Sequence, residues 1–154
     1  MRIVSNAGSD RVIDLARAAL GPDRTVDLMS PAFSLFAFRE LLEELESVES
    51  ARLVLGSDDA SLALLGGEAD RSGRNRLETR WVAAQAVAWL ESRVQVRRPA
   101  AGVPQAALVV RDARSEPSVG VLGSFAFSTD GFGITPGNPM SVIQASESAS
   151  EAGQ

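Results

Sequence analysis

The stretch QAALVVRDARSEPSVGVLGSFAFSTDGFG, residues 105–133, decides the fold. An apolar run at 106–110 has the composition of a buried strand, and a second apolar run at 119–122 follows a short charged loop. The two runs predict a pair of hairpin strands. A Gly- and Ser-rich turn region follows at 123–133, and a last strand is predicted at 140–144.

Toward the N-terminus, predicted strands alternate with predicted helices. Three short runs have the alternation or the apolar composition of strands: 25–30, 52–55 and 94–96. Apolar residues recur at helical spacing in three longer segments: 10–20, 34–48 and 77–92. In the last of these helices the spacing favours a face with Trp81, Ala84, either Val87 or Ala88, and Leu90. The alternation indicates an α/β domain with a mixed β-sheet flanked by helices, parallel early in the chain and antiparallel late.

Length and composition fit one globular domain. The chain has 154 residues, of which 45% are hydrophobic and 23% are charged, and a domain of that size can bury a core of its own. We expect the α/β domain to span residues 1–144. We expect residues 145–154, which are mostly Ser, Ala, Glu and Gly, to form a disordered tail. Because no apolar run has membrane-spanning length and no signal peptide is visible, the sequence predicts a cytoplasmic protein.

Three residue types that carry much of enzyme chemistry are missing. The chain contains no Cys, no His and no Lys, and all 15 basic residues are Arg. Their absence excludes disulfides, thiolate and imidazole catalysis, Cys- and His-type metal sites, Schiff bases and the P-loop lysine. We expect no cofactor, and the composition argues against enzymatic activity. The remaining route to catalysis is a metal held by carboxylates. The candidate ligands are Asp27, Asp58, Asp59 and Asp112, and their spacing does not require a metal site.

The net charge of −5 is unevenly distributed along the chain. Residues 71–114 hold nine Arg and three acids, whereas residues 1–70 hold six Arg and thirteen acids. Such an asymmetry can mark a nucleic-acid-binding face, since Arg forms bidentate contacts with phosphates. The candidate residues are Arg71, Arg74, Arg76, Arg80 and Arg111. In the alternative interpretation, the acidic helices pair with the basic segment inside one fold.

The opening stretch resembles the motif region of phospholipase D-like domains. In that family a His-x-Lys on a strand is followed four residues later by Asp, and a later Gly-Ser-x-x-Asn completes a phosphate pocket. Asp112 stands at the position of the motif Asp, and Gly123 and Ser124 match the Gly-Ser pair. The phosphate-engaging positions differ from the family, because they are occupied by Gln105 for His, Ala107 for Lys and Phe127 for Asn.

The resemblance extends over residues 8–144. RVIDLARAALGPDRTVDLMSPAFSLFAFRELLEELESVESARLVLGS and NRLETRWVAAQAVAWLESRVQVR are similar to the N-terminal phospholipase D-like region of bacterial Swi/Snf-type helicase proteins, some of which are linked to defence against phage DNA. The resemblance implies a single phospholipase D-like lobe. Phosphodiester cleavage in this family requires histidines and lysines that the chain lacks. The sequence therefore predicts a catalytically inactive lobe that acts as a nucleic-acid-binding or targeting module.

A protein interaction or dimerisation module is the alternative function. Lobes of the resembled family usually pack in pairs, so an isolated lobe should leave an apolar face for a second lobe or a homodimer partner. Aromatic and aliphatic residues in the Gly-rich region could form this face, or they could belong to the ordinary core. They are Phe125, Phe127, Phe132 and Ile134.

Overall fold

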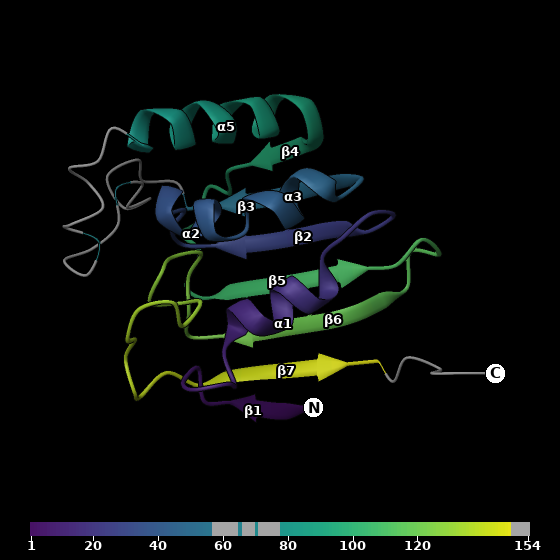
Figure 1. The fold of residues 1–154 in the computed structure, drawn as a ribbon. Helices are drawn as coiled ribbons and strands as arrows, with labels where there is room; N and C mark the ends of the chain where they lie inside the picture. The colour runs from purple at the N-terminus through teal and green to yellow at the C-terminus, as the bar shows by residue number, and fades with distance from the viewer. Residues whose placement is uncertain (57–64, 66–69, 71–77, 149–154) are drawn as a thin grey trace.

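The computed structural model describes residues 1–56, 65, 70 and 78–148, which form one mixed β-sheet with helices packed against it (Figure 1). Within the described residues, seven strands form the sheet in the order β1-β7-β6-β5-β2-β3-β4. The strands are β1 (Arg2–Val4), β2 (Thr25–Ser30), β3 (Ser50–Leu55), β4 (Val94–Arg97), β5 (Ala106–Arg111), β6 (Pro117–Gly123) and β7 (Ile143–Glu147). The helices in the described residues are α1 (Val12–Ala19), α2 (Leu35–Glu40), α3 (Leu42–Ser47) and α5 (Glu78–Arg93). The predicted α/β fold class is confirmed.

The sheet has a parallel half and an antiparallel half. β2, β3 and β4 run parallel, whereas β5, β6, β7 and β1 pair antiparallel with their neighbours. The two halves meet where β2 pairs antiparallel with β5. The connections explain this division. Along the chain, helices connect β2 to β3 and β3 to β4, whereas a short turn joins β5 to β6.

Alternation along the strands gives the sheet one buried face. In β2, Val26, Leu28 and Ser30 are buried while the residues between them are only partly buried. The register places Leu28 between Leu53 of β3 and Leu108 of β5. Because side chains alternate along a strand, the buried residues of neighbouring strands share one face. Helix residues pack on that face, among them Ala16 of α1, Leu45 of α3 and Trp89 of α5.

The helix predicted at 34–48 is two helices. α2 begins after Ser34, whose Oγ accepts hydrogen bonds from the backbone N–H groups of Phe36 and Ala37 at 3.2 and 3.5 Å. At Leu41 the backbone leaves the helical conformation (φ −115°, ψ 13°), and α3 begins at the next residue. No Gly or Pro marks this break in the sequence. Leu41 is buried at the turn, which indicates that core packing decides its conformation.

The predicted start of a disordered tail at residue 145 is wrong. β7 ends at Glu147, and Ala145 is buried, with Val121 of β6 and Arg2 of β1 as its partners in the sheet. The last strand was predicted three residues too early, at 140–144, because the second half of β7 is polar. Only Ile143 and Ala145 point into the core, and hydrogen-bonded ladders to two neighbours hold the strand. β1 is not predicted from the sequence, since three residues carry too short a pattern. Residues 149–154 lie outside the described residues.

α5 buries a different face from the one that its spacing favours. Val82, Ala86 and Trp89 are buried, whereas Trp81 and Val87 are 51% and 52% exposed. The indole Nε1 of Trp89 donates a hydrogen bond to a backbone oxygen of α3 at 2.8 Å. Both sets of positions have helical spacing, so the packing against α3 decides the rotation of α5.

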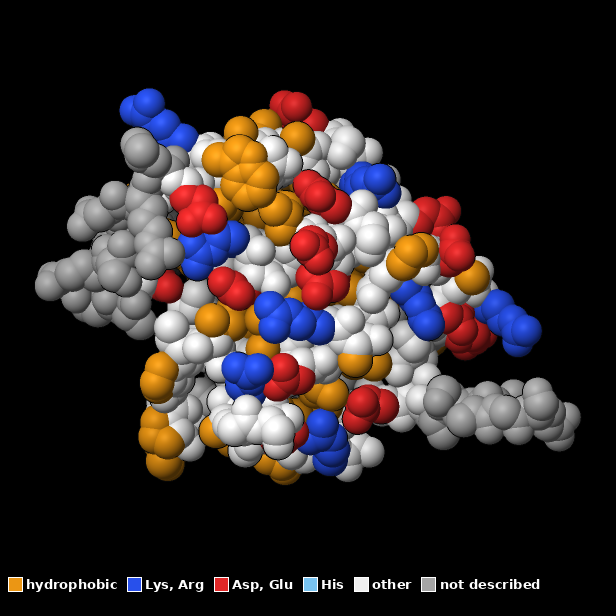
Figure 2. All heavy atoms as spheres, viewed as in Figure 1, with side chains coloured by type: hydrophobic (Ala, Val, Ile, Leu, Met, Phe, Trp, Pro, Cys, Tyr) orange, Lys and Arg blue, Asp and Glu red, His pale blue; other side chains and the backbone are white. Residues whose placement is uncertain are grey.

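The side of the molecule that carries the helices has mixed charges. Figure 2 shows acidic and basic side chains interspersed on this side. The guanidinium of Arg17 lies 3.5 Å from the carboxylate of Glu40 and 3.6 Å from that of Glu44, which joins α1 to α2 and α3. Arg39 pairs with Glu78 at 3.7 Å. The arginines in these pairs belong to the first 70 residues and not to the basic segment 71–114.

Candidate functional site

Two positions of the motif that resembles phospholipase D-like domains lie at one end of the sheet. Gln105 stands directly before β5, and Gly123 at the end of β6 pairs with Ala106, so Gln105 and Ser124 emerge at the same end, both exposed. Gly123 has a φ of 153°, and a Cβ there would lie 2.1 Å from the backbone oxygen of Val142. The chain that enters β7 thus approaches too closely for any side chain at this position.

Ala107 and Phe127, which stand where the resembled family has Lys and Asn, lie in a strand and in the core. Ala107 is a half-buried residue of β5. Phe127 is buried, and its ring stacks on that of Phe33 with 4.8 Å between the ring centroids. Its backbone N–H donates a hydrogen bond to the Oγ of Ser30 at 2.8 Å. Phe127 therefore fastens the turn after β2 to the core and presents no side chain to a ligand.

Asp112 lies at the opposite end of the sheet from Gln105 and Ser124. It occupies the turn between β5 and β6, where its Oδ1 accepts hydrogen bonds from the backbone N–H groups of Arg114 at 2.9 Å and Glu116 at 3.0 Å. The hydrogen bond from Glu116, followed by that from Arg114, lowers the pKa of Asp112. These contacts give Asp112 the role of a turn-fixing residue.

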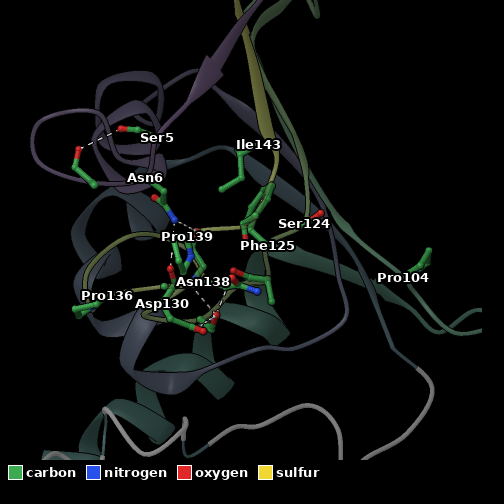
Figure 3. Close-up of a pocket in the computed structure, with 16 residues that line it drawn as sticks. Ser5, Asn6, Pro104, Ser124, Phe125, Asp130, Pro136, Asn138, Pro139 and Ile143 are labelled. Carbon is green, nitrogen blue, oxygen red and sulfur yellow. Dashed lines mark hydrogen bonds between the residues drawn. The ribbon is translucent and has the colours of Figure 1, made fainter.

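A pocket of about 560 Å³ opens beside Ser124 (Figure 3). Hydrogen bonds hold its walls: Asn6 Nδ2 donates to the backbone oxygen of Gly131 at 2.9 Å, and Ser128 Oγ donates to the carboxylate of Asp130 at 2.6 Å. Among the described residues that line the pocket, Asp130 alone is charged. Phosphate is usually held by Arg, Lys or clustered backbone N–H donors. The charge of this pocket therefore does not favour the phosphate that the resembled family holds at these strand ends.

The sheet face opposite the helices is covered by no helix of the described residues, and we call it the open face (Figure 1). Its residues alternate with the buried ones along each strand and are exposed or half-buried. Its apolar residues are Ile3, Met29, Val54, Ala107, Val109 and Leu122. Its charged residues are Asp27, Arg52, Arg97 and Arg111. Ile3 and Leu122 are 61% and 44% exposed, so the open face leaves apolar surface in contact with solvent.

Asp27 joins two arginines near the centre of the open face. Arg52 donates two hydrogen bonds of 2.6 Å to Asp27, from Nε to Oδ1 and from Nη2 to Oδ2. Nε of Arg111 donates to the same carboxylate at 3.1 Å. The hydrogen bonds from Arg52, and after them those from Arg111, hold the pKa of Asp27 below its usual value. With three arginines to one aspartate, the open face carries a net charge of +2.

A groove of about 400 Å³ lies on the open face. Its floor is apolar and consists of Met29, Val54, Ala107 and Val109. Polar side chains border the apolar ones: Asp27 and Arg52 in the next row along β2 and β3, and Gln95 and Arg97 on the edge strand β4. The side chain of Arg52 is 64% exposed although it is paired with Asp27. Arg97, on the edge strand β4, is exposed and forms no ion pair with another described residue. The groove therefore combines an apolar floor with guanidinium groups that can still be bound.

The structure keeps apart the two predicted nucleic-acid-binding arginines that it describes. Arg111 is at the end of β5, where it pairs with Thr25 at the start of β2. Arg80 is exposed in the first turn of α5, which begins close to α2 at the other end of the sheet (Figure 1). The remaining three candidates lie outside the described residues: Arg71, Arg74 and Arg76.

The other residues that the sequence singled out are structural or lie outside the described residues. Phe125, Phe127 and Phe132 are buried and pack edge-on or stacked with one another and with Phe33, so they belong to the core and cannot form a docking face. Asp58 and Asp59 lie outside the described residues. Among the described residues, no three potential metal ligands cluster, and none of the helices combines the length and apolar character needed to cross a membrane.

Comparison of the chain with protein-family models and with curated proteins finds no match. The phospholipase D-like resemblance therefore stays a prediction from the sequence. The open face, with its groove and its Asp27 cluster, is not a site that the sequence reasoning identified. A register that places Asp27 opposite Arg52 in the next strand was needed to see it.

Proposed function

We propose that this chain is a non-catalytic, phospholipase D-like lobe that acts as a protein-docking module through its open face. One observation carries the proposal: three neighbouring strands of the sheet run parallel, yet one face of the sheet is uncovered in the described residues. Parallel strands usually have helices over both faces. A partner that lies on the open face would complete the missing layer.

The composition of the open face supports docking. An apolar floor with a polar border is typical of protein interfaces, in which Arg is enriched. Exposed apolar side chains at Ile3 and Leu122 extend the surface beyond the groove. Catalysis by the resembled family's route has no support, because the chain contains neither His nor Lys.

A neutral amphipathic peptide tests whether the open face docks a protein segment. The peptide would have a leucine stripe and a glutamine polar face, and it would be titrated into the isotopically labelled chain with nuclear magnetic resonance as the readout. We expect the resonances of Met29, Val54 and Val109 to shift. Val54→Asp should abolish the effect, whereas Val87→Asp, which adds the same charge on the helix side, should not. Shifts confined to the helix side, or none at all, would contradict the proposal.

Nucleic-acid targeting is the second candidate function. Arg80 favours it, because its side chain is exposed in the first turn of α5 and forms no ion pair with another described residue. It directly follows a segment that contains Arg71, Arg74 and Arg76. Guanidinium groups spaced in this way could contact successive phosphates of a nucleic acid, as a helicase-associated or phage-defence module would require.

Fluorescence anisotropy with short single- and double-stranded DNA tests this second function. Binding should weaken as salt increases, because phosphate contacts release counterions. Replacement of Arg71, Arg74, Arg76 and Arg80 by Ala should lower the slope of log affinity against log salt by about one unit for each lost phosphate contact. Arg114→Ala, at the distant β5–β6 turn, is the matched control. Failure to bind either form of DNA at low salt would exclude the function.

A further inference from the structure

We infer that the partner of the open face is an acidic amphipathic helix of a different protein. The inference rests on the proposed docking function and specifies the chemistry of what docks. Two properties of the groove carry it: the shape of the uncovered layer and the excess of positive charge around an apolar floor.

The uncovered half of the sheet fits a helix. β2 and β3 have six residues each, and a strand of that length spans about 20 Å. A helix that follows it would need about 13 residues at a rise of 1.5 Å each. A helix laid along β2 and β3 would place one end of its apolar stripe on Met29 and Val54 and would then pass over Asp27 and Arg52, the next pair on the same face. In layered α/β folds, helices take this position over parallel strands.

The charge of the groove selects acidic residues for the flanks of that helix. Arg97 at one border is exposed and forms no ion pair with another described residue. Arg52 uses two N–H groups on Asp27, but a guanidinium has five N–H donors, so it can still bind a second carboxylate. Carboxylates on the flank of the helix that lies over β3 and β4 would reach these two arginines, because both strands lie on the same side of β2. Basic residues in the same places would meet like charge.

The same features disfavour two other occupants. A second copy that packs its own open face against the first would bring another net charge of +2, and the like charges would repel. Single-stranded nucleic acid on a sheet face depends on aromatic side chains for base stacking. The strands of the described sheet present no aromatic residue on the open face. An acidic amphipathic helix would cover the apolar floor and pair with the arginines at the borders.

Three peptides that differ only in charge test the inference. Each would have about 18 residues, or five helical turns, with the same leucine stripe and with Glu, Gln or Lys on the polar face. The readout is the dissociation constant from nuclear magnetic resonance titration, with resonance shifts locating the site. We expect the Glu peptide to bind at the groove about tenfold more tightly than the Gln peptide, and the Lys peptide to bind more weakly than both.

Charge reversal at the border gives the decisive control. Arg97→Glu should weaken the Glu peptide about tenfold and favour the Lys peptide, whereas Arg114→Glu, with the same change of net charge at the β5–β6 turn, should leave the order intact. Equal affinity for all three peptides at the groove would overturn the acidic partner and leave the docking function standing. No binding of any peptide at the groove would overturn both.

Discussion

The two faces of the sheet are built from neighbouring residues of the same strands and yet differ in their exposure to solvent. In β3, Leu53 is 1% exposed beneath the helices, and Val54, the next residue, lies half-buried on the open face. In β6, Val121 and Leu122 divide in the same way, with exposures of 2% and 44%. Apolar character is similar within each pair. The position of the helices therefore decides which apolar residues stabilise the fold and which remain available to a partner.

The two faces also differ in their polar groups. On the helix-covered side, Ser30 at the end of β2 and Ser34 at the start of α2 are buried, and their hydroxyls form hydrogen bonds that fix the turn after β2 and the first turn of α2. The open face holds Asp27 between Arg52 and Arg111, with charged groups still in contact with solvent. The buried hydroxyls therefore fix the backbone. The charged groups of the open face pair with one another and can still bind the side chains of a partner.

The largest expected difference between the faces is in side-chain truncation. Leu53→Ala should lower the free energy of unfolding by about 2–5 kcal/mol, because it removes buried methyl groups and leaves a cavity. Val54→Ala should lower it by less than about 1 kcal/mol, since the side chain already meets solvent. Urea unfolding followed by circular dichroism measures both. Equal losses would show that the open face is as important to the core as the covered one.

Two glycines of β6 extend the comparison to the backbone. Gly123→Ala should cost about 1–3 kcal/mol, because the new Cβ would lie 2.1 Å from the backbone oxygen of Val142. Gly120→Ala, on the open face, should be close to neutral, since no atom lies within 4 Å of its added Cβ. Thermal unfolding of the two variants checks this. A stable Gly123→Ala variant would contradict the close approach of the two segments.

The Asp27 cluster should give a smaller and pH-dependent effect. Asp27→Asn should cost about 1 kcal/mol at pH 7, because it breaks charged hydrogen bonds to Arg52 and Arg111 near the surface. The folded protein holds the pKa of Asp27 below its ordinary value. The contribution is therefore fully present above the unfolded pKa, near 4, and is lost as pH falls through the lower folded pKa.

Urea unfolding of the wild type and Asp27→Asn between pH 7 and pH 2 measures this contribution. The two stability curves should converge at the acidic end. Asp23→Asn is the control, since Asp23 forms no ion pair with another described residue and its φ of 61° suits Asn as well as Asp. A constant gap between Asp27→Asn and the wild type down to pH 2 would exclude a linkage through this carboxylate.

Local signals were enough to predict much of the fold. The strand at 25–30 matches β2, and the helix at 77–92 matches α5 to within one residue at either end. Both segments have clear periodicity. The break at Leu41 and the face that α5 buries could not be predicted, because both depend on packing between segments. Trp81 and Trp89 each fit a helical stripe, and only contact with α3 distinguishes them.

The candidate site was harder to predict than the fold. Asp112 and Ser124 belong to one motif in the sequence, but β5 and β6 carry them to opposite ends of the sheet. One signal for the open face was present: Asp27 and Arg52 interrupt apolar runs in β2 and β3, where strands buried on both faces would be continuously apolar. Their pairing with each other and with Arg111 required the register, which a single sequence does not provide.

Thiol labelling tests most directly whether the sheet has one covered and one open face. The chain has no Cys, so Val121→Cys and Leu122→Cys would each carry a single thiol on opposite faces of β6. We expect the thiol at 122 to react with a thiol reagent at close to the rate of a free peptide. The thiol at 121 should react at least about a thousandfold more slowly, because labelling requires the structure to open. Equal protection of both thiols would contradict an open face and with it the proposed docking surface.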